Sequence, residues 1–385
     1  MIQRLAQNEN YDFQRGNQTV RVPFDATDPA GATVETLARQ IDLTALVPAA
    51  PLVRYADRTH VTVTGGLPYR VGGETFRVAE DTTVDVADAL DTGSIAPGTD
   101  YAVYITSNQN RRFVVSASQT APAGFTPASS KRLGGFHTIC RSVPADLQMA
   151  PAAAYPGTLH PLAGWTAGDI LPRSVWAANF RPCCPDPTGM VYMREVDTWV
   201  DIYNGSGTIA APQSKFGGSR LHTKTAVEFM TGYGNVGKLL LSDMEFWFAS
   251  LGSNCGTVVA GAAQPNPDTT GGHLDTAGYP MVSAIGCEEM CGLQSQWLRE
   301  FSANSGGSWD LTTQPTKAFD GGSNTFGAHY YMQYYRAVIA GGNWTTATVA
   351  ACGPLYRAAV NSRSIAYGDI GGRGSSRSLH TIPNE

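Results

Sequence analysis

The sequence predicts a chain that is mainly β-structure, with an α+β part in its C-terminal half. Charged residues make up only 15% of the 385 residues, well below the roughly 25% of typical domains. The 42 Gly and 23 Pro residues supply many turns. Short alternating apolar and polar runs recur up to residue 145, where Thr33–Leu46 is either a short helix or another strand, and two further helical patterns follow at residues 223–231 and 242–251.

Three classes of protein are excluded by composition. The net charge of −5 argues against a general nucleic-acid binder. No apolar run reaches the ~18 residues of a membrane-spanning helix. The first 16 residues have no apolar core after their charges, so we expect no secretory signal and no membrane insertion.

The first 50 residues combine short β-like runs, such as Thr19–Phe24, with polar turns. They hold too few apolar residues to bury a core alone, so we expect a β-rich attachment unit that packs against copies of itself. Residues 51–145 predict an antiparallel β-sandwich, because strand patterns alternate with turns at regular spacing. Its predicted strands begin at Thr59, Thr75, Tyr101, Arg112 and Arg132.

Residues 146–172 are rich in Pro, Ala and Gly, which predicts a connection between domains. Six of the seven Trp residues follow in residues 173–385, which we expect to form a separate domain. Its second helix has Ser242 as the N-cap and Glu245 three residues later, which is a capping box. The residues expected on the buried face of this helix are Met244, Trp247, Phe248 and Leu251.

The seven Cys residues have no zinc-type spacing, and we expect packed free thiols. A metal or redox pair stays open as an alternative, with Cys287 and Cys291 preceding an expected helix at Trp297. The His residues have no i, i+4 partners of the metal-binding kind. Gln264–Asp268 is similar to a calcium-binding lectin triplet but is more typical of a turn. We therefore expect no catalysis, no metal and no cofactor.

Four segments of the C-terminal half resemble the C-type-lectin-fold domains of the formylglycine-generating-enzyme type, in the same order along the chain. They are Gly237–Ala249, Gln296–Phe301, Arg336–Trp344 and Asp369–Arg373. The resemblance implies a C-type lectin fold for residues 173–385. Enzymes of this type use a pair of active-site cysteines, so an oxidase that uses Cys352 and a second thiol is the alternative function.

A second resemblance covers more of the chain. The segments Ala96–Ile105, Lys131–His137, Phe180–Met190, Trp199–Tyr203 and Ser214–Gly218 are similar to the major tropism determinant family of Bordetella phage. This resemblance implies an N-terminal β-prism, a β-sandwich and a C-type lectin fold. It also implies a homotrimeric tail-fibre protein of the virion that is attached to other phage tail proteins and binds a host cell-surface receptor, a protein or a glycan.

In that family the last ~40 residues are diversified by an error-prone retroelement that changes adenines. Asn codons altered at their adenines cannot become codons for Lys, Glu, Gln, Met or Trp. No Lys, Glu, Gln or Met occurs between Tyr334 and Asn384. This absence supports a diversified segment.

The predicted receptor-binding residues mix aromatic, Arg and small polar side chains, as protein-binding loops do. They are Asn343, Thr345, Thr346, Thr348, Tyr356, Arg357, Asn361, Arg363, Ile365, Tyr367 and Asp369. The predicted scaffold of the site consists of Gly341, Gly342, Trp344, Gly371 and Arg373. Residues 336–385 hold five Arg against two acidic residues, which favours an anionic receptor surface.

Two interpretations of this segment without receptor binding stay open. It can be an ordinary polar surface loop that contains buried Tyr residues. Alternatively, the lectin fold serves only virion assembly, and then Tyr367 and Arg363 are buried between subunits.

Overall fold

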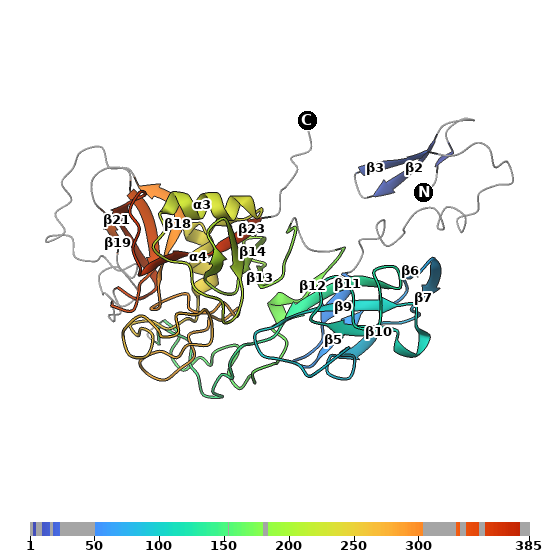
Figure 1. Ribbon diagram of the computed structural model, residues 1–385, viewed down its shortest axis with the longest axis horizontal. Coiled ribbons are helices and arrows are strands. Elements are labelled where there is room, and N and C mark those ends of the chain that lie inside the picture. Colours follow the sequence, from blue (N-terminus) through green and yellow to red (C-terminus); the bar gives the residue numbers. More distant parts are fainter. Residues whose placement is uncertain are drawn as a thin grey trace. The chain divides into compact units, whose positions relative to one another are not determined.

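The computed structural model forms two compact units, Met1–Ala49 and Ala50–Glu385. Its described residues are 3–4, 10–15, 18–23, 51–152, 154–179, 184–302, 329–331, 336–345 and 351–377. In the first unit, strands β1 (Gln3–Arg4), β2 (Asn10–Arg15) and β3 (Gln18–Pro23) form one antiparallel sheet (Figure 1). The strand predicted from Thr19 is therefore confirmed as β3.

The second unit begins with the predicted antiparallel sandwich, drawn in blue and cyan in Figure 1. One sheet has the order β10-β9-β11-β12, a second has the order β4-β5-β8, and β6 and β7 form a hairpin. Alternating side chains such as Val61, Val63, Val103 and Ile105 fill a common core. The bounds are β4 (Val53–Tyr55), β5 (His60–Val63), β6 (Pro68–Val71), β7 (Glu74–Arg77), β8 (Thr82–Asp85), β9 (Asp100–Thr106), β10 (Phe113–Ser116), β11 (Ser130–His137) and β12 (Trp176–Ala177), with 3-10 turns η1 (Gln109–Arg111) and η2 (Pro172–Ser174).

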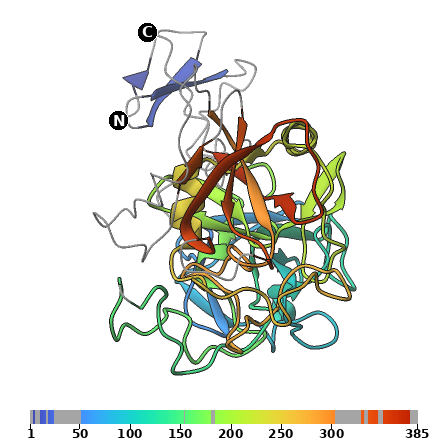
Figure 2. The same cartoon turned by 90° about the vertical axis from the view of Figure 1, so that its left-hand side faces the viewer.

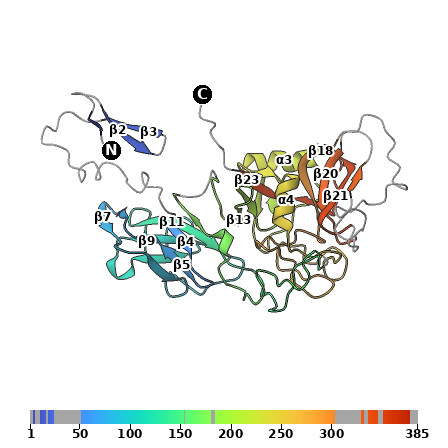
Figure 3. The ribbon, with the colours of Figure 1, turned by 180° about the vertical axis from the view of Figure 1, so that it is seen from behind.

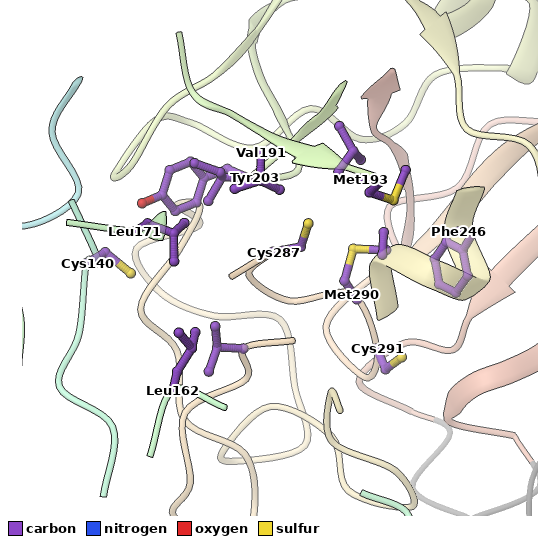
Figure 4. Close-up of a cluster of buried hydrophobic side chains, with 14 of the residues drawn as sticks. Cys140, Leu162, Leu171, Val191, Met193, Tyr203, Phe246, Cys287, Met290 and Cys291 are labelled. Atoms are coloured by element: carbon purple, nitrogen blue, oxygen red, sulfur yellow. The ribbon is translucent and has the colours of Figure 1, made fainter. Parts of the chain in front are cut away.

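The connection at residues 146–172 is a packed part of the structure rather than a spacer. Leu147, Leu162 and Trp165 are buried in the same cluster as Phe246 and Met290. Figure 4 shows Leu162 lining this cluster together with side chains that come from much later in the chain. Pro, Ala and Gly make the segment irregular, but its large apolar side chains join it to the core of the C-terminal part.

The C-terminal part contains two larger sheets. The first has the order β13-β14-β23-β17, so β23 (Gly374–Arg377), the last described strand, lies beside β14 (Thr198–Asp201). The second has the order β19-β21-β20-β18-β22, and its orange and red strands lie together in Figure 2. The strands are β13 (Met190–Met193), β14 (Thr198–Asp201), β15 (Gly205–Thr208), β16 (Ala211–Ser214), β17 (Leu239–Leu240), β18 (Ser295–Ser302), β19 (His329–Tyr331), β20 (Arg336–Gly341), β21 (Gly353–Ser362), β22 (Ile370–Gly372) and β23 (Gly374–Arg377).

The helix expected at Trp297 is wrong. This residue lies in β18, which pairs with β20 on one side and with β22 on the other. Trp297 and its neighbour Leu298 are both fully buried. A strand buried on both faces carries consecutive apolar residues, so its sequence does not alternate as an edge strand does.

Two helices, α3 (Ala226–Asn235) and α4 (Asp243–Ser250), both contact β18 (Figure 3). The capping box of Ser242 and Glu245 is confirmed, since each side chain bonds the backbone N–H of the other residue. The predicted buried face of α4 is wrong. Met244 is 50% exposed, whereas Glu245, Phe246, Ala249 and Ser250 are buried. Glu245 can face inward because Arg299 and Arg377 pair with its carboxylate.

We predict that His160 makes the packed connection sensitive to acid. Its side chain is buried, and its Nδ1 accepts a hydrogen bond from the Leu162 N–H at 3.1 Å. Burial lowers the pKa of His160 to about 4. The unfolded chain therefore takes up a proton at a higher pH than the folded chain does. The stability from neutral His160 is complete above pH ~6.5 and falls by up to about 3 kcal/mol as the pH drops to ~4.

The measurement is urea unfolding of the wild type and of His160→Asn at several pH values between 7 and 4. The difference in unfolding free energy between the two proteins should shrink or reverse toward low pH, because the Asn side chain keeps an acceptor but does not titrate. Other titrating groups cancel in this difference. Parallel pH profiles would contradict the prediction.

Candidate functional site

The candidate site is built on residues 336–377, which we call the C-terminal segment. This segment runs through β20, a turn at residues 342–345, β21, a second loop at residues 363–369, and then β22 and β23. Its strands β20, β21 and β23 lie between other strands, and β22 lies at a sheet edge, while the two loops carry exposed residues. Side chains of the same short stretch therefore divide into inward supports and outward groups.

Gly341 and Gly342 begin the first turn. Both have left-handed backbone angles, with φ values of 85° and 77°. A Cβ atom on Gly341 would also clash with the Met290 carbonyl oxygen. Glycine is thus required at Gly341 for both its backbone conformation and the close approach of the Met290 loop.

Asn343 and Asp369 join the two loops. The Asn343 side chain donates to Asp369 Oδ2 at 2.6 Å and accepts from the Thr345 N–H at 2.9 Å. The Asp369 carbonyl oxygen accepts from the Ser295 N–H at 3.0 Å. Asn343 is buried, so the prediction that it contacts a receptor is corrected: its amide group orders the turn.

Trp344 is half-buried and packs on the buried side chains of Val259, Met281 and Leu293. The guanidinium of Arg220 lies 5.2 Å from the centre of its ring. A cation over an indole face stabilises the ring's position. Trp344 thus supports the turn that presents Thr345.

Arg373 is the fully buried cation of the segment. It donates to the carbonyl oxygens of Asp201 (2.8 Å), Ile202 and Glu288. It also donates to the side-chain oxygens of Asn204 (3.2 Å) and Gln296 (3.1 Å). Five acceptors from three parts of the chain, residues 201–204, Glu288 and Gln296, surround one guanidinium, so Arg373 determines where β22 passes into β23.

Arg357 was expected on the binding face, and this expectation is corrected. Its side chain is only 6% exposed and forms an ion pair with Asp243. It also donates to the Pro354 carbonyl oxygen at 2.8 Å and lies 4.8 Å from the centre of the Phe246 ring. The pairing partner lies on α4, so Arg357 holds β21 against this helix.

The remaining predicted contact residues are at the surface or partly exposed. Thr345 and Arg363 are exposed, and Tyr367 is 44% exposed. Four others are partly exposed: Tyr356, Asn361, Ile365 and Asp369. Thr346 and Thr348 lie outside the described residues.

A second group beside the C-terminal segment was not predicted. The Thr223 N–H donates to the Tyr367 carbonyl oxygen at 2.9 Å, so this earlier loop adjoins the face. Asp268 bonds Arg220, His222 and Gln264 in the same region. These residues are up to 48 positions apart, and no local sequence pattern joins them. In particular, the Gln264–Asp268 turn uses its carboxylate for these contacts.

The thiols are packed side chains. Six cysteines among the described residues are free, and five of them are buried. Burial raises the pKa of Cys352 to about 12 and of Cys255 to about 11, and it raises the pKa of Cys291 well above its usual range. A thiol nucleophile or soft-metal ligand acts as the thiolate. The geometry therefore does not favour the oxidase alternative. Within the described ranges no cluster of three or more His, Cys, Asp or Glu could hold a metal ion.

Comparison with known proteins agrees with this architecture. Residues 51–177 match the family model described as the Mtd second domain. The chain is 29% identical over 312 residues to the tail fiber receptor-binding protein of Bordetella phage BPP-1, covering 70% of this chain and 75% of that protein. The chain resembles the major tropism determinants.

Solved structures of these proteins have the same fold. The U1 variant matches with a TM-score of 0.66 and 20% identity, covering 96% of this chain and 92% of that one. The P3c variant matches with a TM-score of 0.63 and 21% identity, covering 85% and 83%. The predicted fold class is thus confirmed: the chain is mainly β-structure, and its α+β C-terminal part has the C-type lectin fold.

We predict that Arg373 and Arg363 differ sharply in their effect on stability. Arg373→Met leaves buried carbonyl oxygens without donors and should lower the unfolding free energy by at least about 3 kcal/mol. Arg363→Ala removes an exposed side chain and should change it by less than about 0.5 kcal/mol. Urea unfolding of both variants measures these values. Equal effects would show that the division into supports and outward groups is wrong.

Proposed function

We propose that this protein is a phage tail-fibre protein that attaches the virion to a host cell by binding a cell-surface receptor. The observation that carries the proposal is the exposed group Thr345, Arg363 and Tyr367, held on loops whose ends are fixed by buried supports. Exposed Tyr and Arg supply much of the energy at binding surfaces. The similarity to a tail fiber receptor-binding protein supports the same function.

The proposed partners are the host receptor, two further copies of the chain in a homotrimer, and other tail proteins. A single small face binds weakly, but linked copies raise the local concentration of binding sites. The first unit is a small sheet by itself, and packing of such sheets between copies is one way to build a trimer. The proposed location is the phage tail. Neither α3 nor α4 is long and apolar enough to cross a bilayer.

We also propose that the outward positions of the C-terminal segment are exchanged by an adenine-specific retroelement. The lack of Lys, Glu, Gln and Met between Tyr334 and Asn384 supports this. A near-copy of the 3′ end of the gene, differing only at adenines and lying beside a reverse-transcriptase gene, is the expected finding. A neighbourhood with no such copy would contradict it.

The purified 385-residue chain should bind cells of the strain on which its parent phage forms plaques. Preincubating these cells with the chain should reduce adsorption of the phage. Undiminished adsorption, or no binding of the chain, would contradict the proposed function.

Tyr367→Ala and Arg363→Ala should each weaken cell binding by roughly 5- to 30-fold, the effect of losing 1–2 kcal/mol at a central contact. Flow cytometry with fluorescently labelled chain measures this. Arg77→Ala, an exposed position on β7 of the sandwich, is the matched control and should bind normally. Unchanged binding of both test variants would favour a purely structural role for the lectin fold.

A further inference from the structure

We propose that the receptor face extends beyond the C-terminal segment onto a fixed edge, which we define as His222, Thr223 and Gln264, and that Asp268 is the positioning residue of this edge. The inference rests on the proposed function, because it assigns further contacts to the same face. All three edge residues precede Arg336, where the C-terminal segment begins. Exchange of residues in that segment would therefore leave them unchanged.

The edge adjoins the most exposed aromatic side chain of the face. The Thr223 N–H donates to the Tyr367 carbonyl oxygen at 2.9 Å. Thr223 and Gln264 are exposed, and the His222 side chain is 30% exposed. A partner that covers Tyr367 therefore comes within reach of the edge.

One carboxylate orients the edge. Asp268 Oδ2 accepts from Gln264 Nε2 at 2.7 Å and lies 3.0 Å from His222 Nε2. The other nitrogen of His222, Nδ1, lies 2.8 Å from the Thr223 hydroxyl oxygen. The three side chains are thus connected to Asp268 before any partner arrives, which lowers the entropy cost of binding.

The charge of Asp268 is paired with the buried guanidinium of Arg220. Its Oδ1 accepts from Nε of Arg220 at 2.7 Å and from Nη2 of the same guanidinium. The Arg220 side chain is fully buried. Because the Asp268 charge is paired with Arg220, the edge presents uncharged acceptors such as the Gln264 amide oxygen. It fits a receptor surface that offers neutral donors such as hydroxyl or amide groups.

The backbone of the edge is held in a costly conformation. Thr223 has a φ of 55°, and Ala262, two residues before Gln264, has a φ of 48°. For a β-branched residue such as Thr this left-handed region is a true outlier. Such strain persists only where surrounding contacts impose it, and it gathers at binding sites.

Through Arg220, Asp268 is also linked to Trp344. The Arg220 guanidinium that it holds lies against the Trp344 ring, and Trp344 supports the turn that carries Thr345. The same carboxylate therefore positions the fixed edge and one support of the exchangeable loop. Loss of its charge should disturb both together.

A blocking experiment tests the edge as a contact. Gln264→Cys, labelled with a maleimide carrying a polyethylene glycol chain, should bind cells of the plaque-forming strain at least 10-fold more weakly than the unlabelled variant. Leu159→Cys, at a side chain that is 56% exposed in the packed connection, is the matched control and should bind equally with and without the label. The wild-type chain treated with the same maleimide gives the background from its native thiols.

If labelled Gln264→Cys binds as well as the unlabelled protein, the edge lies outside the face and the inference fails, while the proposed function stands. If the wild-type chain itself fails to bind these cells, the proposed function fails with it.

A second experiment tests Asp268 as a positioning residue. In Asp268→Asn, hydrogen exchange should quicken at the amides of Thr223 and Thr345 and stay unchanged in β9 of the sandwich. Cell binding should fall at least 10-fold, and Asp268→Glu, which keeps the charge, should restore part of it. Uniformly faster exchange, or unchanged exchange at both amides, would overturn the positioning role.

Discussion

The C-terminal part depends on one buried guanidinium. Arg373 has no exposed surface, so the cost of removing its charge from water must be offset by a complete set of acceptors. These acceptors come from the end of β14, from the loop that precedes β18, and from β18 itself. The charge is therefore accommodated only when all of these elements are in place. This requirement fixes the point at which the C-terminal segment re-enters the sheet.

With this end fixed, the residues of the C-terminal segment divide into those that stabilise the fold and those that face solvent. Arg357 and Asn343 point inward and contribute to folding, although both belong to residue types that also suit a binding surface. Thr345 and Tyr367 are exposed. Replacing an outward residue costs little folding free energy, whereas replacing an inward one removes several hydrogen bonds at once. A face of this kind can change its specificity without losing its shape.

Sequence patterns predicted the features that depend on residues close together in the chain. Alternation predicted the sandwich strands, and the spacing of Ser242 and Glu245 predicted the start of α4. The buried face of α4 could not be predicted, because Glu245 is turned inward by Arg377, which lies 132 positions away. For the same reason Arg357 was placed on the surface and the Asp268 cluster was missed. Charged side chains are ordinarily exposed, and only the folded chain brings their distant partners to them.

The packed connection at residues 146–172 has a mechanical consequence. In the proposed tail fibre, a bound cell that moves would pull on the C-terminal part. A loose tether would take up this tension as chain entropy and let the two parts swing apart. Here Leu147, Leu162 and Trp165 are buried among side chains of the C-terminal part. Pulling the two parts past each other would therefore have to disrupt close-packed side-chain contacts. The sandwich and the lectin-fold part would then resist a pulling force as one rigid body. The exposed loops of the C-terminal segment would keep their orientation while the force acts.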